Sequence, residues 1–132
     1  MFGALMVVGV VSHGVVRHLV QTAPLWAAVV LGLRGRELAK WCAMPCFSLW
    51  LAIMVFIWLY LLGWARLVSG TFTPTEIAMT LVVGAAAVAG FGVAIRWRTA
   101  TRSTTALAAF ALFSCLQLIA FRVSFLPGIA RD

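Results

Sequence analysis

Long apolar segments separated by short basic clusters constrain this chain more than any other feature. A helix needs about 20 apolar residues to cross the hydrocarbon core of a bilayer. Four segments satisfy this length, at about residues 13–33, 44–67, 74–95 and 104–125. Of the 132 residues, 64% are hydrophobic and 10% are charged, whereas about a quarter of a soluble domain is charged. The sequence therefore predicts an all-α integral membrane protein, a single-domain antiparallel bundle of four transmembrane helices with short loops.

The aromatic residues of the second segment indicate its depth in the membrane. Trp41 and Trp64 are 23 positions apart, about 34 Å along a helix. This is close to the spacing of the two interfacial belts in which tryptophan is enriched. Pro45 is then expected in the first turn of the helix, where its missing N–H group costs little.

The third segment has the clearest start. Thr73, Pro74 and Glu76 occupy the N-cap, N1 and N3 positions of a capping box. The helix that follows is rich in small residues, including the pair Ala86 and Gly90 at a spacing of four, which favours close approach between helices in lipid. We therefore expect this helix to be the packed centre of the bundle.

Residues 1–12 form an apolar N-terminal extension whose place is not settled by the sequence. A single helix over residues 1–33 would be about 50 Å long, well beyond the bilayer core. The extension is expected to lie along the outer surface, to continue as a steeply leaning helix, or to reflect a start codon chosen too far upstream. It lacks the basic region and cleavage site of a secretory signal.

The distribution of basic residues predicts the orientation. The two loops expected on one side carry Arg34, Arg36 and Lys40, and Arg96, Arg98 and Arg102, while the other side carries Arg66, Arg122 and Arg131. Six against three places both basic loops in the cytoplasm and both termini outside, in what we expect to be a bacterial inner membrane. The net charge of +7 then reflects orientation and contact with anionic lipid rather than nucleic acid binding.

The remaining polar side chains of the spans fall in the outer half of the membrane. Ionisable groups at such depth usually face the bundle interior or a partner. The predicted polar cluster consists of Arg17, Gln21, Arg66, Glu76, Gln117 and Arg122. Since Glu76 is its only carboxylate, pairing with one or two arginines is expected, and the remaining positive charge could hold an anion such as a lipid phosphate. The alternative is a purely structural cluster whose arginines extend to the headgroups.

The histidines and cysteines offer weaker candidates. His13 and His18 lie about 140° apart on a regular helix, so they cannot share a metal ion, and no metal site is predicted. Each follows a glycine by four residues, so axial ligation of haem or a chlorophyll-type pigment stands as an alternative to hydrogen-bonded interfacial histidines. Cys42 and Cys46 are expected to be small buried residues rather than a redox pair. With Cys115 they suggest no disulfide framework.

No motif points to a reaction. The chain has no nucleophile elbow, phosphate-binding loop or zinc ligand set, and Glu76 at the edge of a span argues against a proton-coupled exporter. We therefore expect a non-catalytic accessory, assembly or structural subunit that packs against other membrane proteins through its aromatic second span. The alternative function is binding or transfer of an anionic lipid, quinone or other amphiphile at the polar cluster. An enzyme is the third possibility.

Overall fold

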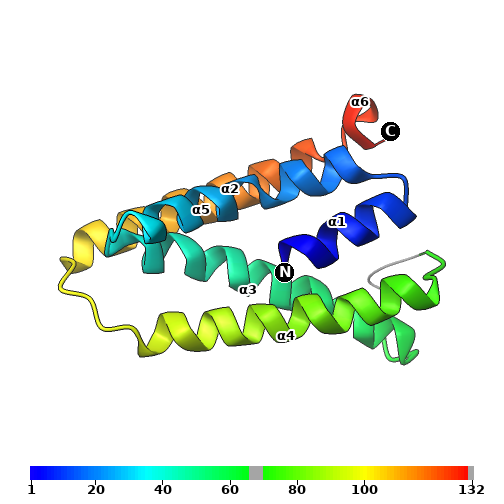
Figure 1. Cartoon of the computed structure of the whole chain (residues 1–132), viewed down its shortest axis with the longest axis horizontal. Coiled ribbons are helices and arrows are strands. Elements are labelled where there is room, and N and C mark those ends of the chain that lie inside the picture. Colours follow the sequence, from blue (N-terminus) through cyan, green and yellow to red (C-terminus); the bar gives the residue numbers. More distant parts are fainter. Residues whose placement is uncertain (66–69, 131–132) are drawn as a thin grey trace.

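The computed structural model describes residues 1–65 and 70–130, and the regular structure of this part is entirely helical. The helices are α1 (Phe2–Val11), α2 (Val15–Leu33), α3 (Leu38–Leu61), α4 (Pro74–Arg96), α5 (Ser103–Val123) and α6 (Pro127–Ala130) (Figure 1). Helices α2 to α5 are long and apolar enough to cross a membrane. The prediction of an all-helical protein with four candidate spans is therefore confirmed.

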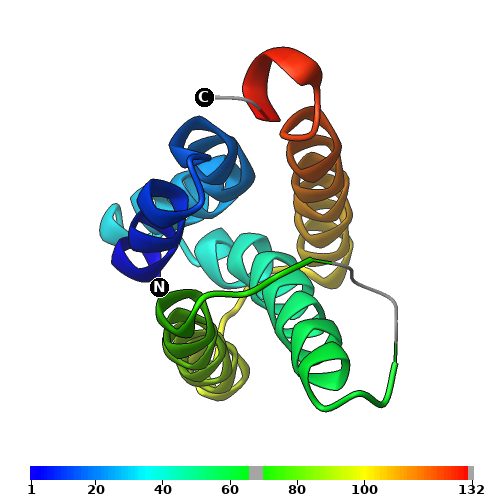
Figure 2. The same ribbon diagram turned by 90° about the vertical axis from the view of Figure 1, so that its right-hand side faces the viewer.

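Helix α3, not α4, is the central helix of the described structure. It packs against α2, α4 and α5, and the view along the long axis shows it between them (Figure 2). Helix α4 packs mainly against α3 and α1. The expectation that the small-residue helix forms the centre is wrong, because small side chains provide a shallow surface against which the larger side chains of α3 pack.

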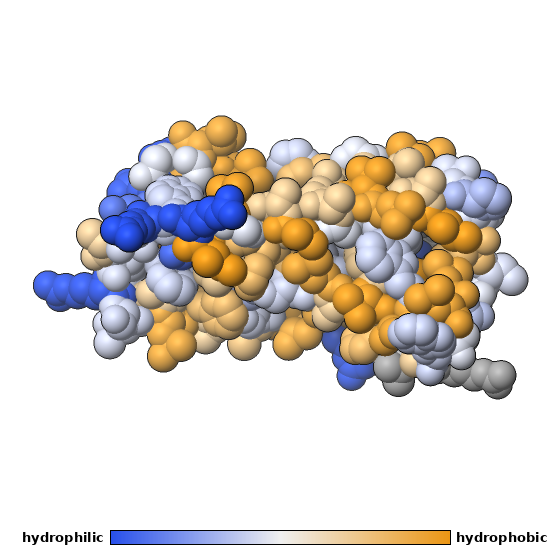
Figure 3. All heavy atoms as spheres, turned by 90° about the horizontal axis from the view of Figure 1, so that it is seen from below, coloured by the Kyte–Doolittle hydropathy of each residue, from blue (hydrophilic) through white to orange (hydrophobic). Residues whose placement is uncertain are grey.

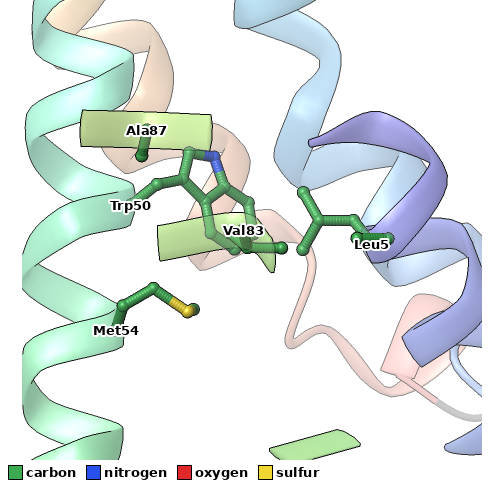
Figure 4. Packing of buried hydrophobic residues seen from close by; sticks show 6 residues of the cluster. Leu5, Trp50, Met54, Val83 and Ala87 are labelled. Atoms are coloured by element: carbon green, nitrogen blue, oxygen red, sulfur yellow. The ribbon is translucent and has the colours of Figure 1, made fainter. Parts of the chain in front are cut away.

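The contact between α3 and α4 shows this relation directly. Trp50 and Met54 of α3 are 3% and 4% exposed, and they lie against Val83 and Ala87 of α4, which are 1% and 0% exposed. Leu5 of α1 closes the same cluster from the opposite side (Figure 4). Large side chains on one helix thus fill the space that small side chains leave on the other.

Residues 1–12 fold back into the structure as α1. This ten-residue helix packs against α2 and α4, so the extension does not continue α2 as one long helix. The turn is tight: the Gly14 N–H donates to the Gly9 carbonyl at 2.8 Å, and His13 adopts a left-handed φ of 51°. A Cβ atom on Gly9 would lie 3.0 Å from the Cα atom of Val15, so only glycine fits there without a shift of the backbone.

The second predicted span is displaced by six residues. Helix α3 begins at Leu38 and ends at Leu61, against the expected 44–67. Pro45 therefore lies inside the helix rather than in its first turn. At this interior position it leaves the Trp41 carbonyl without its usual intrahelical donor. Gly63, with a φ of 75°, follows the last turn and supplies the left-handed residue that commonly ends a helix.

The start of α4 has the expected capping box. The Thr73 hydroxyl accepts from the Glu76 N–H at 3.2 Å, and the Glu76 Oε2 atom accepts from the Thr73 N–H at 2.8 Å. Pro74 is the first helical residue. The bounds of α4 and α5 agree with the predicted 74–95 and 104–125 within two residues.

The two basic loops meet at one end of the molecule. Glu37, which precedes α3, accepts hydrogen bonds from the Ala100 N–H at 3.0 Å and the Thr101 hydroxyl at 3.2 Å. Lys40 donates to the Trp97 carbonyl at 2.7 Å. Along the surface between the two ends, apolar residues predominate (Figure 3). The predicted grouping of these two loops on one side is consistent with this geometry.

Cys42 and Cys46 are buried free thiols, as expected, and the Sγ atom of Cys46 lies 3.4 Å from the Cys42 carbonyl. Cys115 is exposed and also free. The described cysteines therefore contribute packing and no disulfide.

Replacing Gly90 with leucine is expected to destabilise the contact between α3 and α4. A Cβ atom on Gly90 would lie 2.5 Å from the ring of Phe47, so the ring must move, and overpacking of this kind costs about 1–3 kcal/mol. Gly92→Leu is the matched control, because nothing lies within 4 Å of its Cβ position and both changes gain the same helix propensity. Thermal unfolding in detergent measures the difference; equal melting temperatures would contradict the packing role of Gly90.

Candidate functional site

A cavity of about 660 Å³ lies near the end of the molecule at which α1 turns into α2 and α4 begins. All five helices α1 to α5 contribute to its walls, and residues 70–72 of the connection between α3 and α4 line it as well. Its walls are mainly apolar and include Leu5, Val8, Ile53, Met54, Ile57, Met79, Val83, Leu118, Phe121 and Phe125. Ligand pockets usually have volumes of about 300–1,000 Å³ and walls of this kind.

Arg17 provides a positive charge in this cavity. It lies in the first turn of α2, and its guanidinium carbon is 5.8 Å from the centre of the Phe125 ring. The Nε atom is buried and has no hydrogen-bond partner among the described residues. A guanidinium normally uses all of its N–H groups as donors, so this one has bonding capacity that the described protein does not use.

His18, the next residue, also lines the cavity and is 6% exposed. Its Nδ1 atom lies 2.8 Å from the Gly14 carbonyl. Because a carbonyl can only accept, Nδ1 carries the hydrogen, and in the neutral ring Nε2 is then an acceptor. His18 is about 100° from Arg17 around a regular helix, but both side chains border one cavity, to which the folded-back α1 contributes Leu5 and Val8.

The two histidines named as tetrapyrrole ligand candidates have different surroundings. His13 is an exposed residue of the turn between α1 and α2. The space over Gly14, beside His18, is filled by the Arg17 side chain, whose Nε atom lies 3.5 Å from the position of a Cβ atom. Within the described residues no group of three or more His, Cys, Asp or Glu side chains is placed to hold a metal ion.

Glu76 lines the same cavity from the start of α4. Its Oε2 atom accepts from the N–H and the hydroxyl of Thr73, both at 2.8 Å. Within the described residues, Glu76 forms no ion pair within 4.0 Å, so the expected pairs with Arg17 and Arg122 are absent from this part of the chain. The capping box directs this oxygen to the helix terminus instead. Arg66, the third expected partner, lies outside the described residues.

The other predicted members of the cluster are placed apart. The Gln21 side chain donates to the Ser124 hydroxyl at 2.9 Å, and the Gln117 side chain donates to the Gln21 carbonyl at 2.8 Å. These buried bonds join α2 to α5, although Gln21 also borders the cavity. Arg122 is exposed and lines a more open depression that adjoins the cavity and shares Phe121 and Phe125 with it. The predicted cluster is based on the depth of each residue along its helix. In the structure, the side chains of these residues point in different directions.

No protein-family model, curated protein or solved structure matches this chain. The arrangement of its own side chains is therefore the basis of the functional argument. The feature that stands out is a mainly apolar cavity whose lining also includes Arg17, His18 and Glu76.

Proposed function

We propose that the protein binds a phosphate-bearing membrane lipid or a similar amphiphile in the cavity that the five helices α1 to α5 line. The observation that carries the proposal is the combination of long apolar walls with Arg17, whose buried Nε atom has no partner in the described structure. A phosphate at Arg17 would accept charge-assisted hydrogen bonds, which are among the stronger ones in proteins. The acyl chains of the same molecule would cover the apolar walls.

The bilayer is part of this proposal. We infer that α2 to α5 cross it as an antiparallel bundle, with the two basic loops in the cytoplasm, both termini outside and a bacterial inner membrane as the setting. Support comes from the length and hydropathy of the four helices and from the excess of Lys and Arg at one end. In this orientation the cavity lies in the outer half of the membrane.

A role as an accessory subunit, expected from the sequence, has less specific support. Between 17% and 33% of the most apolar window of each candidate span is buried within the molecule, and Val55 and Phe56 on α3 are 49% and 42% exposed. Lipid covers such faces as well as a partner protein does, so they do not select between the two. The cavity favours the amphiphile.

Photo-crosslinking tests whether a lipid occupies the cavity. The protein is purified in a mild detergent, supplied with a phospholipid that carries a diazirine near the end of one acyl chain, and irradiated. We expect peptide mass spectrometry to find adducts on cavity residues such as Ile53, Ile57 and Met79. Adducts confined to outward-facing residues such as Val93 and Leu112, which are 66% and 57% exposed, would mean that lipid only surrounds the protein.

The orientation has its own test. In a cysteine-free variant, a single cysteine in place of Arg36 or Ala100 is expected to react with a membrane-impermeant thiol reagent from the cytoplasmic side. A cysteine in place of Thr71 is expected to react from the outside. Thr71 borders the cavity, and its labelling from the cytoplasm would invert the proposed orientation.

A further inference from the structure

The cavity is lined by two side chains of opposite charge that form no ion pair with each other in the described structure. Arg17 on α2 and Glu76 on α4 both line it, together with His18. Within the described residues, neither has an ion-pair partner within 4.0 Å. Both charges therefore remain available to a bound molecule.

The charge of the ligand follows from this arrangement. The Arg17 Nε atom is buried, where an uncompensated charge is costly, whereas the Glu76 carboxylate lies at the exposed start of α4 and acts on the headgroup through its charge. A purely anionic headgroup would compensate Arg17 but would be repelled by Glu76. A zwitterionic headgroup carries both charges on one molecule and compensates both side chains at once.

The hydrogen-bonding groups of the cavity indicate which zwitterionic headgroups fit best. Arg17 can only donate, so it requires an acceptor such as a phosphate oxygen. Glu76 uses Oε2 for the Thr73 N–H and hydroxyl, which leaves Oε1 as an acceptor, and the Nε2 atom of His18 is an acceptor as well when the ring is uncharged. The positive part of the headgroup should therefore carry N–H donors. A primary ammonium has three of them, whereas a trimethylammonium has none.

We propose that the cavity selects zwitterionic phospholipids with a primary ammonium group, of the phosphoethanolamine type. The phosphate binds Arg17, and the ammonium group binds Glu76 and His18. This inference rests on the proposed function and adds the class of headgroup to it.

A series of N-methylated lipids tests the selectivity on the unaltered protein. Phosphoethanolamine, monomethyl, dimethyl and trimethyl (phosphocholine) lipids with the same acyl chains keep the charge of the headgroup while the number of N–H donors falls from three to none. Competition between pairs of these lipids is measured by native mass spectrometry. We expect affinity to fall at least tenfold across the series. A phosphoglycerol lipid, which is anionic, is expected to bind more weakly than the primary amine.

The variant Glu76→Gln tests the origin of the preference. Glutamine also supports a capping box, so the start of α4 is retained while the charge is lost. We expect the preference for the primary amine over phosphocholine to fall severalfold in this variant and to be unchanged in Glu37→Gln. Glu37 is the matched control, because its carboxylate binds the loop that contains Ala100 and Thr101 at the basic end.

Two results would contradict the headgroup selectivity but leave the proposed lipid binding unaffected. They are equal affinities across the methylation series and tightest binding of the phosphoglycerol lipid. Either would be seen alongside crosslinks to Ile53 and Met79. Absence of cavity crosslinks for every lipid would instead contradict the proposed function itself. A preference for the primary amine that survives Glu76→Gln would show that Glu76 does not bind the ammonium group.

Discussion

Replacing Arg17 with glutamine is expected to lower the affinity for phospholipids by roughly tenfold to a hundredfold. Hydrogen bonds to charged groups contribute about 1.5–3 kcal/mol, and each 1.4 kcal/mol corresponds to a factor of ten. Glutamine keeps a polar side chain of moderate length but loses the charge and most of the donors. The number of lipid molecules retained per protein, and their competition constants, are measured by native mass spectrometry.

Arg122→Gln is the matched control for this experiment. Arg122 is at the same end of the molecule, but it is exposed and lines the adjoining depression, while its side chain is not part of the cavity wall. We expect lipid retention by this variant to equal that of the unaltered protein. If both variants lose lipid equally, the effect reports the general positive charge of this end and not a site at Arg17. If neither loses lipid, Arg17 does not bind phosphate.

The second large effect is expected at the contact between α2 and α5. Gln21 is 5% exposed and donates to Ser124, which is 0% exposed. Replacing Gln21 with alanine removes this bond and leaves a void, so the free energy of unfolding should fall by about 2–4 kcal/mol. Unfolding by increasing proportions of SDS in mixed micelles, followed by far-UV circular dichroism, measures the change.

Gln117→Leu separates the hydrogen bond from the volume of the side chain. Gln117 donates to the Gln21 carbonyl, but its own Oε1 atom is buried and has no partner among the described residues. Leucine loses the one bond and also removes the cost of the unpaired oxygen, so we expect a change within about 1 kcal/mol. If Gln117→Leu lowered the free energy of unfolding as much as Gln21→Ala, the distinction between a satisfied and a half-satisfied side-chain amide would be contradicted.

The features that could be predicted from the sequence are those that depend on neighbouring residues. The capping box of Thr73 and Glu76 involves atoms three residues apart, and it forms as predicted. The four candidate spans follow from hydropathy over windows of about 20 residues, and the structure has them. The end of α3 at Leu61 was missed, because the apolar sequence continues beyond the glycine that ends the helix.

The features that could not be predicted depend on how the helices are rotated about their axes. Counting residues along a helix gives the depth of Arg17 and Arg122 but not the direction in which either side chain points. The structure turns Arg17 into a cavity and Arg122 out of it. The fold-back of α1 depends on contacts of Leu5 with Trp50 and Val83, which are far apart in the sequence. His18 becomes a cavity residue only as a result of that packing.

The half-length of α1 has a consequence for the shape of the membrane around the protein. Its ten residues extend about 15 Å, so in the proposed orientation we expect α1 to accompany the four long helices through only one half of a bilayer about 30 Å thick. In the proposed orientation the molecule displaces roughly 100 Å² more area, one helix cross-section, from the outer leaflet than from the inner leaflet. If the four helices cross the membrane as proposed, the protein occupies a wedge in it, and we expect a bilayer that bulges toward the outside to accommodate this wedge with less strain than a flat one.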